Sequence, residues 1–138
     1  MKKLLIPEGL DGFSTLDACV IDIEAETATF IKLGASVSVI KHKNTSEVVV
    51  SKSLPIGVVQ NIRPTITKIP LSFGDVIFLA SDGVVDSFAS VDEFKVFIND
   101  TKIYNIQKHL DNIIFDAEYQ SKHLDDMTII GINLLKNS

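Results

Sequence analysis

The run Val76–Ala80, Val-Ile-Phe-Leu-Ala, holds five apolar residues and no polar side chain. A strand with one face in water would alternate apolar and polar residues, so this run predicts a central strand covered on both faces. Protein must then lie in layers on both sides of its sheet. The chain has 138 residues, 46% hydrophobic and 22% charged, which is the composition of one globular domain with a real core.

Short apolar or β-branched runs, separated by turn residues, predict further strands on both sides of this run. The polar segments Glu24–Glu26 and His42–Ser46 predict turns, so the runs that flank each of them should pair as a hairpin. The other expected strands are Leu16–Ile23, Thr27–Leu33, Val37–Lys41, Glu47–Ser51, Thr65–Leu71 and Met127–Leu135.

Two helices are expected in the C-terminal half of the chain. Ser90 is followed three residues later by Glu93, a capping box that predicts a short helix through about Ile98. A second helix is predicted over Thr101–Tyr119, where apolar residues recur every three or four positions. Its apolar stripe consists of Ile103, Ile106, Leu110, Ile113 and Ala117. Strands, then helices, then one strand predict an α+β fold with a mostly antiparallel sheet and helices on one face.

Composition excludes several classes of protein. The net charge of −5 argues against nucleic acid or an anionic membrane surface as the main partner. No apolar run approaches the roughly 18 residues of a spanning helix, so no direct membrane contact is expected. The single cysteine, Cys19, excludes an internal disulfide and favours the cytoplasm. The three histidines do not have metal-ligand spacing, and His109 is expected to be exposed or hydrogen-bonded.

Two acidic positions stand out beside the predicted central and closing strands. Asp82 follows Val76–Ala80 directly, and Asp125 precedes Met127–Leu135. If these strands are antiparallel neighbours, the two carboxylates converge, and at about 4 Å they would repel by roughly 4 kcal/mol at an effective dielectric of 20. Oxygen ligands without nearby His or Cys suit Mg²⁺ or Mn²⁺. Both segments are also common as an ordinary turn and a solvated strand start, so this alternative stays open.

The order of several segments resembles one enzyme family. Val76–Asp86 and Asp125–Ile130 are similar to the late motifs of the PPM (PP2C-like) metal-dependent protein serine/threonine phosphatases. Phe13–Asp22, Ala28–Ala35 and Ser53–Gly57 resemble its bacterial sporulation branch, the stage II sporulation protein E family. The resemblance covers nearly the whole chain, from Phe13 to about Leu134.

This resemblance implies an α/β/β/α sandwich around a two-metal centre, in which a metal-activated water attacks a protein phosphoserine directly. Asp82 and Asp125 match two metal ligands, Mn²⁺ or Mg²⁺ being the expected cofactor. The residues expected to support the site are Ser81, Gly83, Asp126 and Thr128. The implied substrate is a phosphorylated anti-anti-sigma factor, whose dephosphorylation switches on a sigma factor. The resemblance also implies that the parent protein is anchored by upstream transmembrane helices.

One departure from the family pattern is large. Family members carry an earlier Asp-Gly-x-Gly motif and a preceding acidic residue, and Asp11-Gly12 does not match that motif. We therefore expect residues 1–12 to be an N-terminal segment and residues 13–138 to be the C-terminal part of a phosphatase domain. The sandwich would be incomplete, activity of the isolated chain weak or absent, and the uncovered sheet a surface for a homodimer.

Two other interpretations remain open at the level of the sequence. The missing Asp-Gly-x-Gly motif also fits a non-catalytic PPM-like module that docks or regulates a partner. The other interpretation is an ordinary α+β domain in which the acidic turns have no function.

Overall fold

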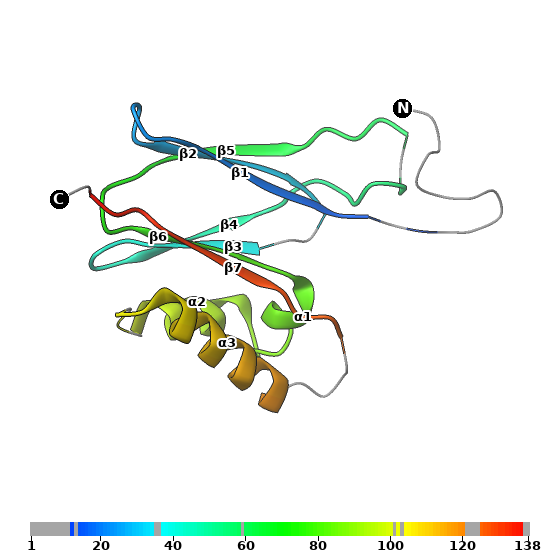
Figure 1. The fold of residues 1–138 in the computed structure, drawn as a ribbon. Helices are drawn as coiled ribbons and strands as arrows, with labels where there is room; N and C mark the ends of the chain where they lie inside the picture. Colours follow the sequence, from blue (N-terminus) through cyan, green and yellow to red (C-terminus); the bar gives the residue numbers. More distant parts are fainter. Residues whose placement is uncertain are drawn as a thin grey trace.

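The computed structural model describes residues 12, 14–34, 37–58, 60–100, 102, 104–120 and 125–136. Within them the chain forms two antiparallel sheets that face each other, with helices on the outer side of one sheet (Figure 1). The first sheet has the order β1-β2-β5, with β1 at Leu16–Asp22, β2 at Thr27–Leu33 and β5 at Thr65–Pro70. The second has the order β4-β3-β6-β7, with β3 at Val37–Lys41, β4 at Ser46–Val50, β6 at Val76–Ala80 and β7 at Ile129–Asn133.

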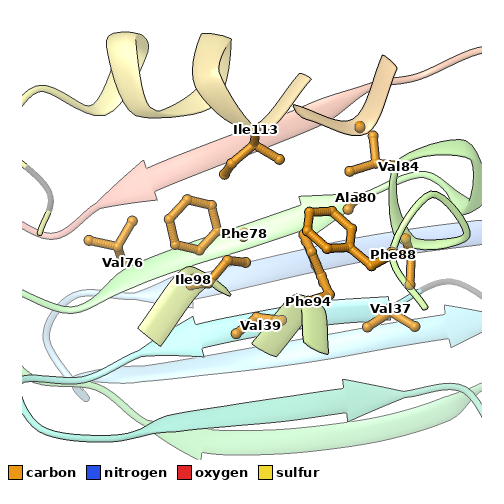
Figure 2. Close-up of a cluster of buried hydrophobic side chains, with 12 residues drawn as sticks. Val37, Val39, Val76, Phe78, Ala80, Val84, Phe88, Phe94, Ile98 and Ile113 are labelled. Atoms are coloured by element: carbon orange, nitrogen blue, oxygen red, sulfur yellow. The ribbon is translucent and has the colours of Figure 1, made fainter. Parts of the chain in front are cut away.

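The central position predicted for Val76–Ala80 is confirmed. As β6 it lies between β3 and β7, with Ile77 packed in the apolar layer between the sheets and Phe78 in the layer beneath the helices. Both side chains are completely buried. Figure 2 shows Phe78 among side chains that come from the neighbouring strand and from the helices. A strand that contributes to two cores needs an uninterrupted apolar run, which is what the sequence supplies.

The helices are α1 (Asp82–Val85), α2 (Val91–Asp100) and α3 (Ile106–Gln120). The Ser90 cap is confirmed, because the Glu93 amide donates to Ser90 Oγ at 3.1 Å. The predicted start of the second helix at Thr101 is wrong. Helix α3 begins at Ile106 because the Asn105 side chain accepts from the Lys108 amide at 3.0 Å and caps it there, while Thr101 and Ile103 lie outside the described residues.

Strand bounds differ from the prediction mainly at the C-terminal end. Strands β2, β3 and β6 have the predicted bounds, whereas β7 is shorter than Met127–Leu135 at both ends. The Thr128 amide bonds to a side chain, Ser81 Oγ, and Leu134 bonds to the turn before β6 through Asp75. These bonds end the regular ladder.

No helix among the described residues covers the outer face of the first sheet (Figure 1). Apolar side chains are exposed on that face. Val20 is 57% exposed and Ile66 is 64% exposed. The described part of the chain therefore holds the two sheets and one helical layer of the expected four-layer sandwich. None of its helices has the length and apolar character to span a membrane.

His109 differs from its prediction. It lies on α3, is 4% exposed and packs edge-on against Phe78, with ring centroids 5.7 Å apart. Its Nε2 has no hydrogen-bond partner within the part of the chain that the structure describes. Burial lowers the pKa of His109, with a smaller contribution from Lys41, so the ring is held neutral in the core.

His42 lies between two carboxylates at the far end of β3. Its Nδ1 is 2.8 Å from Asp75 Oδ2, and its Nε2 is 2.6 Å from Glu47 Oε2. Burial alone would lower the pKa of His42, but the hydrogen bonds and charges of Glu47 and Asp75 outweigh it and raise the pKa.

The raised pKa of His42 predicts a loss of stability on the alkaline side. A group whose pKa is higher in the folded state stabilises fully below its unfolded pKa, about 6.5, and the effect is lost as pH rises through the folded value. Urea denaturation should therefore show that the wild-type protein loses free energy of unfolding as the pH rises above about 6.5, and that His42→Gln loses less. An equal loss in both proteins would contradict the role of this histidine.

Candidate metal centre

Strands β6 and β7 bring two distant acidic segments to one end of the second sheet. Ala80 pairs with Ile129 in an antiparallel ladder, so the residues after β6 lie beside those before β7. The Ser81 amide donates to the Thr128 carbonyl at 2.9 Å, and the Thr128 amide donates to Ser81 Oγ at 2.9 Å. We call this reciprocal pair of bonds the Ser81–Thr128 clamp.

Gly83 allows the two segments to approach closely. A Cβ atom at this position would lie 2.3 Å from the Asp126 carbonyl oxygen, well inside any allowed contact. The glycine is buried, and the obstacle is backbone that cannot swing away. Only a residue without a side chain lets α1 start directly against the segment that leads into β7.

The carboxylates at this end of the sheet disfavour one another. Burial raises the pKa of Asp82, and the charges of Asp86 and Asp125 raise it further. Asp125 Oδ1 also accepts the Asp126 amide at 2.8 Å, which fixes the carboxylate near its own backbone. The charges of two neighbouring carboxylates thus act on Asp82 where the two strands meet. The pairing of β6 with β7 brings Asp82 and Asp125 to the same end of the second sheet, as predicted.

This donor set fits a hard cation as part of a larger ligand set. Carboxylate oxygens are the ligands that Mg²⁺ and Mn²⁺ take in proteins, and a cation would relieve the repulsion at Asp82. Within the described residues, however, no three His, Cys, Asp or Glu side chains are grouped closely enough to hold a metal by themselves. The roles of Asp82 and Asp125 as metal ligands therefore stay predictions.

The predicted supporting residues all lie at this end of the sheet. Ser81 and Thr128 form the clamp, and Gly83 makes the close approach to the Asp126 carbonyl. The Asp126 side chain is exposed. These contacts give the supporting residues a structural role, because they act on the backbone that carries Asp82 or Asp125.

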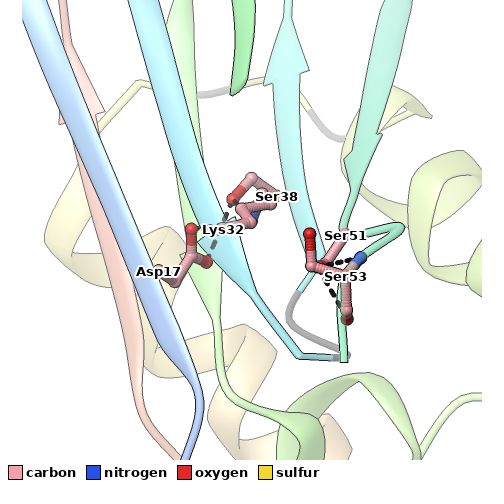
Figure 3. Close-up of polar contacts among 5 residues, drawn as sticks. All are labelled: Asp17, Lys32, Ser38, Ser51 and Ser53. Atoms are coloured by element: carbon pink, nitrogen blue, oxygen red, sulfur yellow. Dashed lines mark hydrogen bonds and ion pairs between the residues drawn. The ribbon is translucent and has the colours of Figure 1, made fainter. Parts of the chain in front are cut away.

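One polar cluster near this end could have been suspected from the sequence but was missed. Lys32 on β2 is completely buried, and its Nζ donates to Asp17 Oδ1 and to Ser38 Oγ, each at 2.7 Å. Ser38 Oγ in turn donates to Asp17 Oδ2 at 3.2 Å. Figure 3 shows the three side chains pointing toward one another. The two-residue period of β2 puts Lys32 on the same buried face as Ala28 and Phe30.

A comparison with protein families gives one match along nearly the entire chain. The model of the family described as stage II sporulation protein E (SpoIIE) matches residues 2–134. The chain belongs to the SpoIIE family. It is 25% identical over 133 residues to stage II sporulation protein E of Priestia megaterium, covering 91% of this chain and 23% of that protein.

Solved structures give the fold independently of the family match. The phosphatase domain of SpoIIE from Bacillus subtilis has a TM-score of 0.74 and 26% identity, over 91% of this chain and 57% of that one. The serine/threonine phosphatase PstP/Ppp of Mycobacterium tuberculosis has a TM-score of 0.71 at 15% identity, over 92% and 63%, which shows the fold alone. The α+β, PP2C-like fold is thereby confirmed, in a chain that spans little more than half of the solved SpoIIE domain.

Manganese is associated with two of these similar proteins. The B. subtilis SpoIIE phosphatase domain has been solved after presoaking with Mn, at a TM-score of 0.75 and 23% identity to this chain over 91% and 58%. The PstP catalytic domain has been solved in complex with two manganese ions, at a TM-score of 0.71 and 14% identity over 88% and 59%.

Proposed function

We propose that this chain forms part of a Mn²⁺- or Mg²⁺-dependent protein phosphoserine phosphatase, with Asp82 and Asp125 as two of its metal ligands. The observation that carries the proposal is the Ser81–Thr128 clamp, which holds the Asp82 and Asp125 segments together in a chain of the SpoIIE family. The manganese bound by PstP supports the choice of metal. Membership of a phosphatase family supports the type of reaction.

The residues of this chain contribute position and charge to the reaction. Asp82 and Asp125 supply oxygen ligands, while the clamp and Gly83 fix the distance between the two segments that carry them. When bound, the metal ions would neutralise the phosphate and lower the pKa of the attacking water. The charges of Asp86 and Asp125 raise the free energy of the ionised Asp82 carboxylate when no cation is bound. Binding of a cation would remove this cost.

The substrate that we propose is a phosphorylated anti-anti-sigma factor, by resemblance to the sporulation branch. A phosphoserine carries nearly two negative charges at neutral pH, so it would be repelled by a site holding only carboxylates. Cation loading must therefore precede productive binding of such a substrate. A phosphoserine peptide should bind more tightly with Mn²⁺ present than without it.

The first test is the thermal stability of the wild-type chain and of Asp82→Asn with and without Mn²⁺. A ligand that binds only the folded state stabilises by about 2.7 kcal/mol at one hundred times its Kd. We expect Mn²⁺ to raise the melting temperature of wild type but not of Asp82→Asn. Without metal, Asp82→Asn should be the more stable protein, because the mutual repulsion at this carboxylate is gone.

A matched control for this experiment is Asp92→Asn. Asp92 is an exposed acidic residue in the first turn of α2. Its replacement by asparagine removes the same charge as Asp82→Asn and leaves the clamp intact. Its response to Mn²⁺ should equal that of wild type. Equal Mn²⁺ stabilisation of wild type and Asp82→Asn would overturn Asp82 as a ligand.

Phosphatase activity of the isolated chain is expected to be weak or absent. No three His, Cys, Asp or Glu side chains among the described residues are grouped to hold a metal, and a two-metal reaction needs both ions in place. Turnover of an aryl phosphate or phosphoserine peptide should stay near background with Mn²⁺. Mn²⁺-dependent turnover that disappears in Asp82→Asn would show instead that the chain assembles a working site.

A second candidate function is a non-catalytic binding or regulatory module of the PPM type. The small number of grouped ligands among the described residues favours it. This module would bind its protein partner equally well with and without Mn²⁺, and Asp82→Asn would not change that binding.

We also propose that a second copy of the chain covers the outer face of the first sheet. Leu16, Val20 and Ile66 are exposed large apolar residues on its strands. Burial of apolar area at about 25 cal/mol per Å² favours covering such a face. Light scattering should give a mass that rises with concentration, and replacement of Val20 and Ile66 by threonine should restore the monomer.

A further inference from the structure

The Asp17–Lys32–Ser38 network joins the two sheets beside a buried apolar cluster. Asp17 on β1 and Lys32 on β2 belong to the first sheet, and Ser38 on β3 belongs to the second. A cluster of buried apolar side chains also lies between the sheets. The members of this apolar layer are Ala28, Phe30, Ile40, Val49, Ile69, Leu71 and Ile77.

A buried ion pair of this kind often adds little net stability. The free energy lost when both charges leave water is about as large as the free energy gained from their attraction. Apolar residues of similar volume therefore often stabilise a fold equally well. A charged network does differ from an apolar contact in one respect, because its hydrogen bonds form at only one alignment of the strands. The network therefore fixes the position of the first sheet relative to β3.

The network lies at the end of the sandwich that carries the candidate metal centre. Ser38 is the second residue of β3 and pairs directly with Leu79 of β6. Leu79 is two residues before Ser81, where the clamp to Thr128 begins. A shift of β3 relative to the first sheet would therefore also move the end of β6, close to Asp82.

We propose that the Asp17–Lys32–Ser38 network is a positioning device for the candidate site. By tying β3 to the first sheet, it holds the end of β6 in the register that keeps the Ser81–Thr128 clamp closed and Asp82 beside Asp125. The metal-binding consequence rests on the proposed function, whereas the effect on the clamp does not.

The decisive variant is Ser38→Ala, which removes both Ser38 bonds and leaves the Lys32–Asp17 pair in place. Ser46→Ala is the matched control. Ser46 is also a buried serine of the second sheet, but it lies at the opposite end, where Lys41 pairs with it and its Oγ donates to Asn99 at 2.9 Å.

Amide hydrogen exchange measured by NMR reads out the clamp without any metal or activity. In Ser38→Ala, the Ser81 and Thr128 amides should exchange about five-fold faster than in wild type, the effect of losing about one net buried hydrogen bond. The His42 and Leu134 amides, bonded at the opposite end, should stay within about two-fold. Ser46→Ala should leave Ser81 and Thr128 unchanged.

Unchanged exchange at Ser81 and Thr128 in folded Ser38→Ala would overturn the proposal, as would an equal effect of Ser46→Ala on them. If Ser38→Ala does not fold, Asp17→Leu combined with Lys32→Met and Ser38→Ala replaces it, because that variant leaves no buried polar group behind. In that triple variant the Ser81 and Thr128 amides must show the same loss of protection against hydrogen exchange.

A Mn²⁺ titration of the same proteins separates this proposal from the proposed function. Ser38→Ala should bind Mn²⁺ about ten-fold more weakly than wild type, the lower range for residues that orient metal ligands. Absence of Mn²⁺ binding in wild type would overturn the metal site, and the exchange result would still decide the positioning role. Wild-type Mn²⁺ affinity in Ser38→Ala would overturn the positioning role alone.

Discussion

Replacing Lys32 by methionine should destabilise the protein by about 3 kcal/mol or more, among the largest effects of any single substitution in the chain. Lys32 is completely buried, and the side chain of its partner Asp17 is only 17% exposed. Methionine fills a similar volume but leaves the Asp17 carboxylate without its counter-charge. Urea denaturation at neutral pH measures the loss.

Two further variants identify the cause of that loss. Lys68→Met removes an exposed lysine from the neighbouring strand β5 and should change the free energy of unfolding by less than about 0.5 kcal/mol. Asp17→Leu in the Lys32→Met background removes the stranded carboxylate and should restore most of the stability. If the double variant stays as unstable as the single one, packing rather than the unpaired charge explains the loss.

The layered fold followed from local patterns that do not depend on distant residues. The apolar run Val76–Ala80 predicted a strand with two buried faces, and β6 contributes to both cores. The start of α3 could not be fixed in this way. Asn99, Asp100 and Thr101 are each acceptable cap residues, and only the observed bond from Lys108 to Asn105 shows which cap is used.

The candidate site was predictable where chain neighbours determine it. Asp82 and Asp125 flank two strands, so antiparallel pairing alone brings them together. The alternation of β2 places Lys32 on a buried face, but its partners could not be predicted, because the network joins three strands and two sheets. Lysine is rarely found fully buried unless it is paired, and the pairing with Asp17 and Ser38 exists only once the sheets are stacked.

Gly83→Ala should disrupt the candidate metal centre more than any other substitution of similar size. Its new Cβ would lie 2.3 Å from the Asp126 carbonyl oxygen, so α1 or the segment before β7 must move. Overpacking against backbone costs about 3 kcal/mol. The same movement separates Asp82 from Asp125, so stabilisation by Mn²⁺ should also be lost.

Gly131→Ala provides the comparison that separates these two effects. Its nearest contacts would be side-chain atoms of α3: Cδ1 and Cγ1 of Ile106 at 3.0 and 3.2 Å, and Cδ2 of Leu110 at 3.1 Å. Those side chains can give by a few tenths of an ångström, so the cost should stay under about 1.5 kcal/mol and the Mn²⁺ response should persist. Equal effects of the two alanines would mean that the close approach of Gly83 to Asp126 does not govern the site.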